Sequence, residues 1–131
     1  MYEANQNEHV EKIIDVILSF PLPATYNKIL VEQIAGCTVG VEQYHDCLKL
    51  LFKPSIGLKM FPLQIPTLLQ GCQIFKESGP ISCQLFVEKG YIVQFEIVDM
   101  GGNTIDWDFF WHNISNAIYD VEYGASDDFL S

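Results

Sequence analysis

The sequence predicts an α+β fold, with a pair of N-terminal helices, an antiparallel sheet of about four to five strands and a C-terminal helix packed on that sheet. Three observations predict it. Apolar residues recur at helical spacing in the first 35 residues, alternate with polar ones from Cys37 to about Asp99, and return to helical spacing from Asp106. Helices that flank a block of strands are typical of an α+β domain.

We expect one domain over residues 1–131, with an acidic, frayed tail at about 124–131. A chain of 131 residues buries roughly two-thirds of its unfolded surface, which is enough for a core. Since 49% of the residues are hydrophobic, extensive disorder is not expected.

The first predicted helix runs from about Asn5 to Phe20 and carries Val10, Ile13 and Ile17 on one stripe. Pro21-Leu22-Pro23 ends it. A second helix follows over about 24–35, with Gly36 placed to cap its end.

Strands are predicted at 37–43 and 47–53, joined by a turn as a first hairpin. The next stretch contains Pro54, Pro62 and Pro66, which break it into a loop. A further strand is expected at about 68–76, kinked at Gly71.

The central hairpin, 81–98, has Gly90 between two alternating segments. A two-residue turn would mix core and solvent residues on one face, so we expect a three-residue loop with Gly90 in the left-handed position. This register pairs Val87 with Tyr91, Leu85 with Val93, Cys83 with Phe95 and Ile81 with Ile97. It places Phe86 beside Ile92 on the other face, which is otherwise polar.

The last helix is expected to begin after Asp106 or Asp108 as its N-cap and to continue to about Val121. Trp107, Phe110 and Ile114 belong to a wide apolar stripe that suits packing on a sheet.

The charge balance limits the classes of partner. There are 17 acidic side chains against 7 basic ones, all lysines, for a net charge of -10. Without arginine or a basic cluster, direct binding of nucleic acid or of an anionic membrane is disfavoured. A basic protein partner is favoured, because opposite fields speed association.

We expect a cytoplasmic location, because the first residues carry no basic segment followed by an apolar run. No apolar run approaches the roughly 18 residues of a membrane span. The four widely spaced cysteines are accordingly interpreted as buried free thiols.

No motif for catalysis, a cofactor or a metal emerges, so we expect a non-enzymatic protein. Tyr44-His45-Asp46-Cys47 holds reactive groups, but neighbouring residues point in different directions, so a structural turn is the simpler interpretation. Asp108, His112 and Ser115 share one helix, where the serine lacks an oxyanion hole. Glu96 has no apolar pocket to raise its pKa for acid catalysis.

The acidity of the C-terminal third is the strongest functional signal, although solubility alone would also explain it. The sharper hypothesis is a protein-binding surface in which an aromatic anchor lies within a charged rim. Its expected residues are Asp99, Asp106, Asp108, Phe109, Glu122 and Tyr123.

The run Leu85-Phe86-Val87, Lys89-Gly90-Tyr91 and Phe95-Glu96-Ile97, with Gly102 and Ile105 after it, resembles a loosely defined group of small bacterial cytosolic proteins. Gln33, Val39, Val41 and the segment 48–52 fit the same layout. Proteins of this group occur near toxin genes of interbacterial competition systems, and many are taken to be immunity proteins. The resemblance implies a partner, a cognate toxin, and transfers no catalytic residue.

The leading hypothesis is therefore an immunity protein that binds and occludes a basic, nuclease-type toxin domain. The alternative is a small-molecule-binding or enzymatic domain with a pocket between helices and sheet. A third hypothesis is a self-associating structural module with Phe86 and Ile92 as a homodimer patch. A monomer or weak homodimer is expected.

Overall fold

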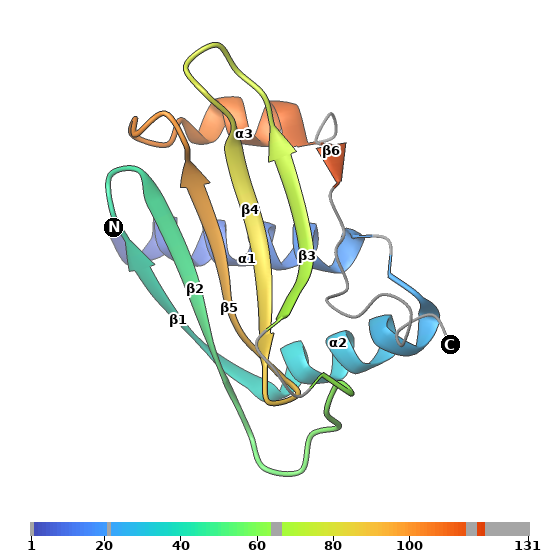
Figure 1. Ribbon diagram of the computed structural model, residues 1–131. Coiled ribbons are helices and arrows are strands. Elements are labelled where there is room, and N and C mark those ends of the chain that lie inside the picture. The colour runs from blue at the N-terminus through green and yellow to red at the C-terminus, as the bar shows by residue number, and fades with distance from the viewer. Residues whose placement is uncertain (1, 21, 64–66, 115–117, 120–131) are drawn as a thin grey trace.

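A computed structural model describes residues 2–20, 22–63, 67–114 and 118–119. The chain forms a six-stranded antiparallel sheet in the order β1-β2-β5-β4-β3-β6, with helices on one of its faces (Figure 1). The predicted α+β class is confirmed. The elements are α1 (Tyr2–Ser19), α2 (Ala24–Gly36), β1 (Cys37–Gln43), β2 (Cys47–Pro54), β3 (Thr67–Ile74), β4 (Ile81–Glu88), β5 (Tyr91–Asp99), α3 (Trp107–Asn113) and β6 (Ile118–Tyr119).

The core lies between the sheet and the helices. Ile13 and Ile17 of α1 are fully buried, as are Leu50, Leu85 and other residues at alternate positions along the strands. These buried side chains form one continuous cluster, to which α3 contributes Phe110. The opposite face, here called the open face, carries no helix in the described part of the chain (Figure 1).

The second helix ends differently from the prediction. Gly36 is its last residue, and Cys37 is the C-cap, with its N–H bonded to the carbonyl of Ile34. A Cβ on Gly36 would lie only 2.6 Å from a methyl carbon of Leu58. The glycine therefore makes room for Leu58 of the β2–β3 loop, and it is not the C-cap of the helix.

The central hairpin is confirmed, but its predicted register is wrong. Lys89 and Gly90 both have positive φ, 54° and 87°, and form a two-residue turn between the paired residues Glu88 and Tyr91. This is the backbone preference of a type I′ turn. A bulge at Val93 then shifts the register by one residue.

The bulge keeps the core side chains of β4 and β5 on one face of the sheet and the other side chains on the opposite face. The predicted three-residue loop was expected to have the same effect. Leu85 lies opposite Phe95, and Cys83 lies opposite Ile97, all on the helix-covered face. Ile92 is also fully buried there, so the predicted pairing of Phe86 with Ile92 on the other face is wrong.

Strand β3 contains its irregularity at Leu69, not at Gly71 as predicted. The pairing with β4 slips by one residue between Leu68 and Gln70. As a result, Leu69 and Gln70 are both fully buried, and Gln70 donates from Nε2 to the carbonyl of Ile17 in α1.

The last helix starts as predicted and ends much earlier. Oδ1 of Asp106 accepts a hydrogen bond from the Phe109 N–H at 3.1 Å, which confirms it as the N-cap. The helix stops at Asn113, and Ile118–Tyr119 pair with β3 as a short edge strand. The predicted continuation of the helix to Val121 is therefore wrong at Ile118 and Tyr119. Pairing with an available sheet edge overrides helical periodicity there.

Candidate functional site

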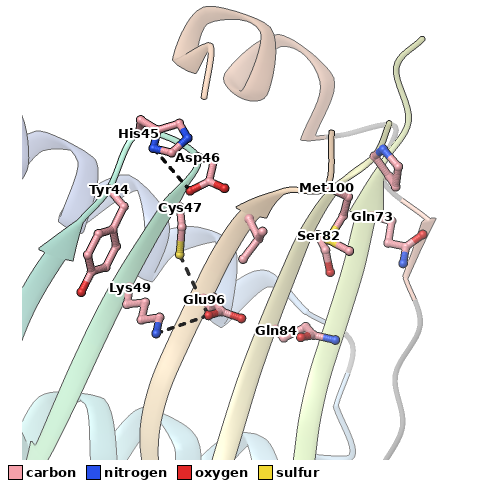
Figure 2. A pocket seen from close by; sticks show the side chains of 12 residues that line it. Tyr44, His45, Asp46, Cys47, Lys49, Gln73, Ser82, Gln84, Glu96 and Met100 are labelled. Carbon is pink, nitrogen blue, oxygen red and sulfur yellow. Dashed lines mark hydrogen bonds and ion pairs between the residues drawn. The ribbon is translucent and has the colours of Figure 1, made fainter. Parts of the chain in front are cut away.

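A groove of about 830 Å³ opens on the open face, near the end of the sheet where α3 lies (Figure 2). Its floor is formed by side chains of the four adjacent strands β2, β5, β4 and β3. Its walls are formed by the β1–β2 turn on one side and by the ends of β4 and β5 on the other. The floor includes Cys47, Lys49, Ser82, Gln84 and Glu96; the walls include Tyr44, His45, Asp46, Pro80 and Met100.

The strand register explains how the floor is assembled. Lys49 of β2 and Gln84 of β4 both lie opposite Glu96 of β5. Side chains alternate along each strand, and the neighbours of these residues, such as Leu48 and Ile97, face the core. The polar floor is thus the outward half of the same alternation that builds the core.

An ion pair lies at the centre of the floor. Lys49 Nζ is 3.7 Å from Glu96 Oε2, and both side chains are about a quarter exposed (30% and 24%). Cys47 Sγ donates to the same carboxylate oxygen over 4.0 Å (Figure 2). Two donors therefore converge on Glu96, and the positive charge of Lys49 offsets the negative charge of this carboxylate.

The cysteine is not set up as a nucleophile. Burial raises the pKa of the Cys47 thiol, and the negative charge of Glu96 raises this pKa further. A thiol needs a lowered pKa to react as a thiolate at neutral pH. The chemistry available at Cys47 is therefore that of a weak hydrogen-bond donor.

The wall residue His45 makes a separate contact. Its Nδ1 lies 3.9 Å from Oδ1 of Asp46, and its side chain is 73% exposed. The sequence expectation that Tyr44–Cys47 do not converge on one atom agrees with these two separate contacts. In the described residues, no group of three or more His, Cys, Asp or Glu side chains could hold a metal ion.

The β1–β2 turn is fixed in place by backbone hydrogen bonds to the rest of the groove. The Asp99 N–H donates to the carbonyl of Asp46 at 2.8 Å, and the Ile105 N–H donates to the carbonyl of His45 at 3.1 Å. A second cavity of about 370 Å³ lies between this turn and the segment that precedes α3. The turn is thus a fixed ridge between two depressions.

Large apolar side chains are exposed at this end of the molecule. Tyr44 and Met100 on the groove walls are 55% and 60% exposed, and Phe75, just after β3, is 59% exposed. The β1–β2 turn, the β3–β4 loop and the loop before α3 all lie at this end (Figure 1). We call it the upper end.

Acidic side chains are exposed at the same end. Glu77 and Asp106 lie on these loops, Glu42 lies near the end of β1, Asp108 lies in the first turn of α3, and Asp46 is half-buried. Two lysines lie near them, and both are paired: Lys76 is bound to Asp99 at 2.9 Å, and Lys49 on the groove floor lies 3.7 Å from Glu96. The upper end therefore combines apolar anchors with an excess of negative charge.

The predicted interface residues are divided by the structure. Asp106 and Asp108 are exposed at the upper end, as expected. Asp99 is only 2% exposed, and its carboxylate binds the Lys76 ammonium and accepts a hydrogen bond from the Gly101 N–H. It therefore does not contribute to the surface. Phe109 is half-buried against the core. Glu122 and Tyr123 lie outside the described residues.

Sequence reasoning missed Tyr44, Asp46 and Met100. The sequence analysis interprets Tyr44 and Asp46 as part of a structural turn, and it assigns no role to Met100. Their common location depends on β5 lying between β2 and β4, because this order brings residues 44–46 close to residues 80 and 100. No local pattern in the sequence specifies that order.

Comparison of the chain with models of protein families, with curated proteins and with solved structures found no match. Among the described helices, none has both the length and the apolar character needed to cross a membrane.

Proposed function

We propose that this protein is an immunity protein, which binds a basic, nuclease-type toxin domain through its upper end and neutralises it by occlusion in the cytoplasm. The observation that carries the proposal is the combination of exposed Tyr44, Met100 and Phe75 with an excess of carboxylates at the same end of a chain of net charge -10. The resemblance to immunity proteins near toxin genes supports the same class of partner.

The apolar side chains supply the anchoring part of such an interface. Aromatic residues and methionine are enriched where proteins bind each other, and they contribute most when they enter pockets of the partner. Tyr44 is well suited, because the turn that carries it is held by hydrogen bonds from Asp99 and Ile105. Little backbone entropy is lost when a residue on a fixed turn binds.

The carboxylates supply speed and selectivity. A nuclease has a basic surface that receives phosphates, and exposed carboxylates can occupy the positions of those phosphates. Asp46, Asp106 and Asp108 come from two different segments at the upper end, so they present charge over a surface and not along one strand. Covering a surface of standard size, about 1,600 Å² in total, would block access of the nucleic acid.

The direct test is neutralisation in cells. The toxin domain encoded beside this chain's gene is expressed alone and together with the chain, and survival is measured. Tyr44→Ala and Met100→Ala together should abolish protection. Ile56→Ala, which removes a fully exposed apolar side chain from the β2–β3 loop at the opposite end, is the matched control and should protect fully.

A second candidate function is small-molecule binding in the groove. Its volume of about 830 Å³ falls within the range of ligand sites, and Lys49, Glu96 and Gln84 offer polar groups on its floor. Lys49→Ala should then remove a ligand-induced rise in melting temperature, whereas it should leave toxin neutralisation little changed.

A further inference from the structure

Strand β1 forms one edge of the sheet and lacks the features that normally protect an edge. It pairs with β2 on one side, and in the described part of the chain no segment pairs with its other side (Figure 1). Its seven residues, Cys37–Gln43, include no proline and no lysine, its pairing with β2 shows no bulge, and Glu42 is its only charged residue. Exposed edges with these properties tend to pair with another strand.

The backbone of β1 presents hydrogen-bonding groups to this free edge. Tyr44 donates to the carbonyl of Cys47, and Ser55 donates to the carbonyl of Gly36, so even-numbered residues of this segment bond to β2. In an antiparallel ladder the alternate residues face the other way. The N–H and C=O groups of Val39 and Val41 therefore point to the free edge.

The side chains of β1 are also divided between two environments. Val39 and Val41 are half-buried and lie on the helix-covered face, next to Phe52 and Leu50 of β2. Thr38, Gly40 and Glu42 are exposed. The apolar half of the strand is thus incompletely covered at the edge.

We propose that a second copy of this chain pairs with this edge, β1 against β1 in antiparallel orientation, with the two-fold axis at Gly40. This register pairs residues 38–42 of the strand with their counterparts. Val39 then lies opposite the second copy's Val41, so an apolar row continues from Phe52 across both edge strands to the second copy's Leu50. The outward backbone groups of Val39 and Val41 gain partners.

Charge complementarity supports a second copy as the occupant. In this register Glu42 lies opposite the second copy's Thr38, and that threonine is paired with Lys53 of its own β2. Glu42 is also opposite Lys49 of its own chain. Glu42 therefore lies in a row across the strands between Lys49 of its own chain and, beyond the second copy's Thr38, the second copy's Lys53. The two-fold axis produces this row twice.

Other registers are less favourable. An axis at Glu42 would place two glutamates directly opposite each other, which is destabilising. A shift by one residue would place the apolar side chains of one strand on the face where the other presents its polar ones. A strand from a basic protein is a different occupant, but Lys49 and Lys53 beside this edge do not favour it.

The first experiment tests the charge row by sedimentation equilibrium at micromolar to millimolar concentration. The wild-type chain should form a reversible dimer. Thr38→Glu places a glutamate opposite Glu42 twice in the dimer and should weaken it by roughly 2- to 30-fold. Combining Thr38→Glu with Glu42→Thr keeps the wild-type net charge, restores the Glu–Thr pairs and should restore the affinity.

The second experiment tests the register by disulfide cross-linking in a Cys37→Ser background, which removes the native thiol of this strand. Gly40→Cys places two thiols at the axis, where opposite Cα atoms of a non-hydrogen-bonded pair lie about 4.5 Å apart, and should cross-link under mild oxidation. Thr38→Cys and Glu42→Cys are matched controls on the same exposed side and should not. A Cβ at position 40 meets only Leu51, at 4.0 Å, so the variant can fold.

A monomer at every concentration, equal cross-linking of the three cysteine variants, or failure of the double charge variant to recover would each overturn the proposal. Exclusive pairing of β1 with a strand of a basic protein would also do so. The result is independent of the proposed function, because these experiments use the purified chain alone and involve no toxin.

Discussion

Lys76 and Asp99 form an ion pair of 2.9 Å that joins the β3–β4 loop to the end of β5. The carboxylate is almost completely buried, and its other oxygen accepts a hydrogen bond from the Gly101 N–H at 2.8 Å. Asp99 therefore holds together two of the segments that carry the exposed side chains of the upper end. Its role is internal, although the sequence suggested a surface role.

Replacing Asp99 by Asn should destabilise the protein by about 3 kcal/mol, because it leaves the Lys76 ammonium without its buried partner. Chemical denaturation measures the loss. Asp108→Asn, which removes the same charge at an exposed position of α3, is the control and should change stability by less than about 0.5 kcal/mol. Equal effects of the two variants would contradict the structural role of Asp99.

Gln33 is a second internal polar group with a specific role. From α2 it donates to the carbonyls of Lys59 and Gly90 at 2.8 and 2.9 Å, and its Oε1 accepts from the Ile92 N–H at 2.9 Å. Gln33→Leu should cost about 3 kcal/mol, since buried backbone groups lose their partner. Glu32→Leu, at the exposed neighbouring position, is the control in the same denaturation experiment, and a similar loss there would argue against this role.

Gly90 and Gly57 form a matched pair for the effect of close packing. Both have positive φ, 87° and 92°. A Cβ on Gly90 would lie 2.8 Å from the Cβ of Met60, whereas a Cβ on Gly57 would meet nothing within 4 Å. Both alanine variants carry backbone strain of about 1 kcal/mol, and Gly90→Ala should lose at least about 1 kcal/mol more. Equal melting temperatures of the two variants would contradict this packing.

The contact between α1 and α3 should depend on pH through His9. Its ring lies 4.4 Å from that of Trp107 between centroids, and burial lowers the pKa of His9, with Lys12 lowering it further and Glu8 opposing. Because the folded pKa is below the unfolded value, the unfolded chain binds more protons at mildly acidic pH. The stability associated with neutral His9 is complete above the unfolded pKa of 6.5 and is lost as pH falls through the lowered value.

This dependence is measured by comparing the wild type with His9→Phe, which keeps an aromatic ring against Trp107 but does not titrate. The wild type should lose stability relative to the variant as pH falls from about 7 to about 5. A difference between the two proteins that stays constant over this range would contradict a linkage through His9.

Much of the fold could be predicted from the sequence because local patterns specify it. Helical spacing located α1 and α2, and alternation located β1, β2, β4 and β5 within a residue or two. The register of the hairpin could not be predicted, because a two-residue turn with a bulge at Val93 separates the faces as well as a longer loop does. The end of α3 depends on pairing with β3, which is a tertiary contact.

The candidate site was less predictable than the fold. Asp99 and Asp106 look alike in sequence, yet one is bound to a lysine distant in the chain and the other is exposed as a helix cap. The groove depends on the strand order β2-β5-β4, which brings Lys49, Glu96 and Gln84 together. Such groupings result from topology and not from local periodicity.

The central claim, that the upper end recognises a basic toxin, is tested most directly by association kinetics with the neighbouring toxin domain. Asp46→Asn, Asp106→Asn and Asp108→Asn together remove three charges from the upper end, and asparagine can still cap α3. Asp15→Asn, Glu32→Gln and Glu88→Gln remove three exposed charges elsewhere. The first variant should associate about tenfold or more slowly, with a weaker salt dependence, while the second stays near wild type. Equal association rates for the two variants would contradict the account.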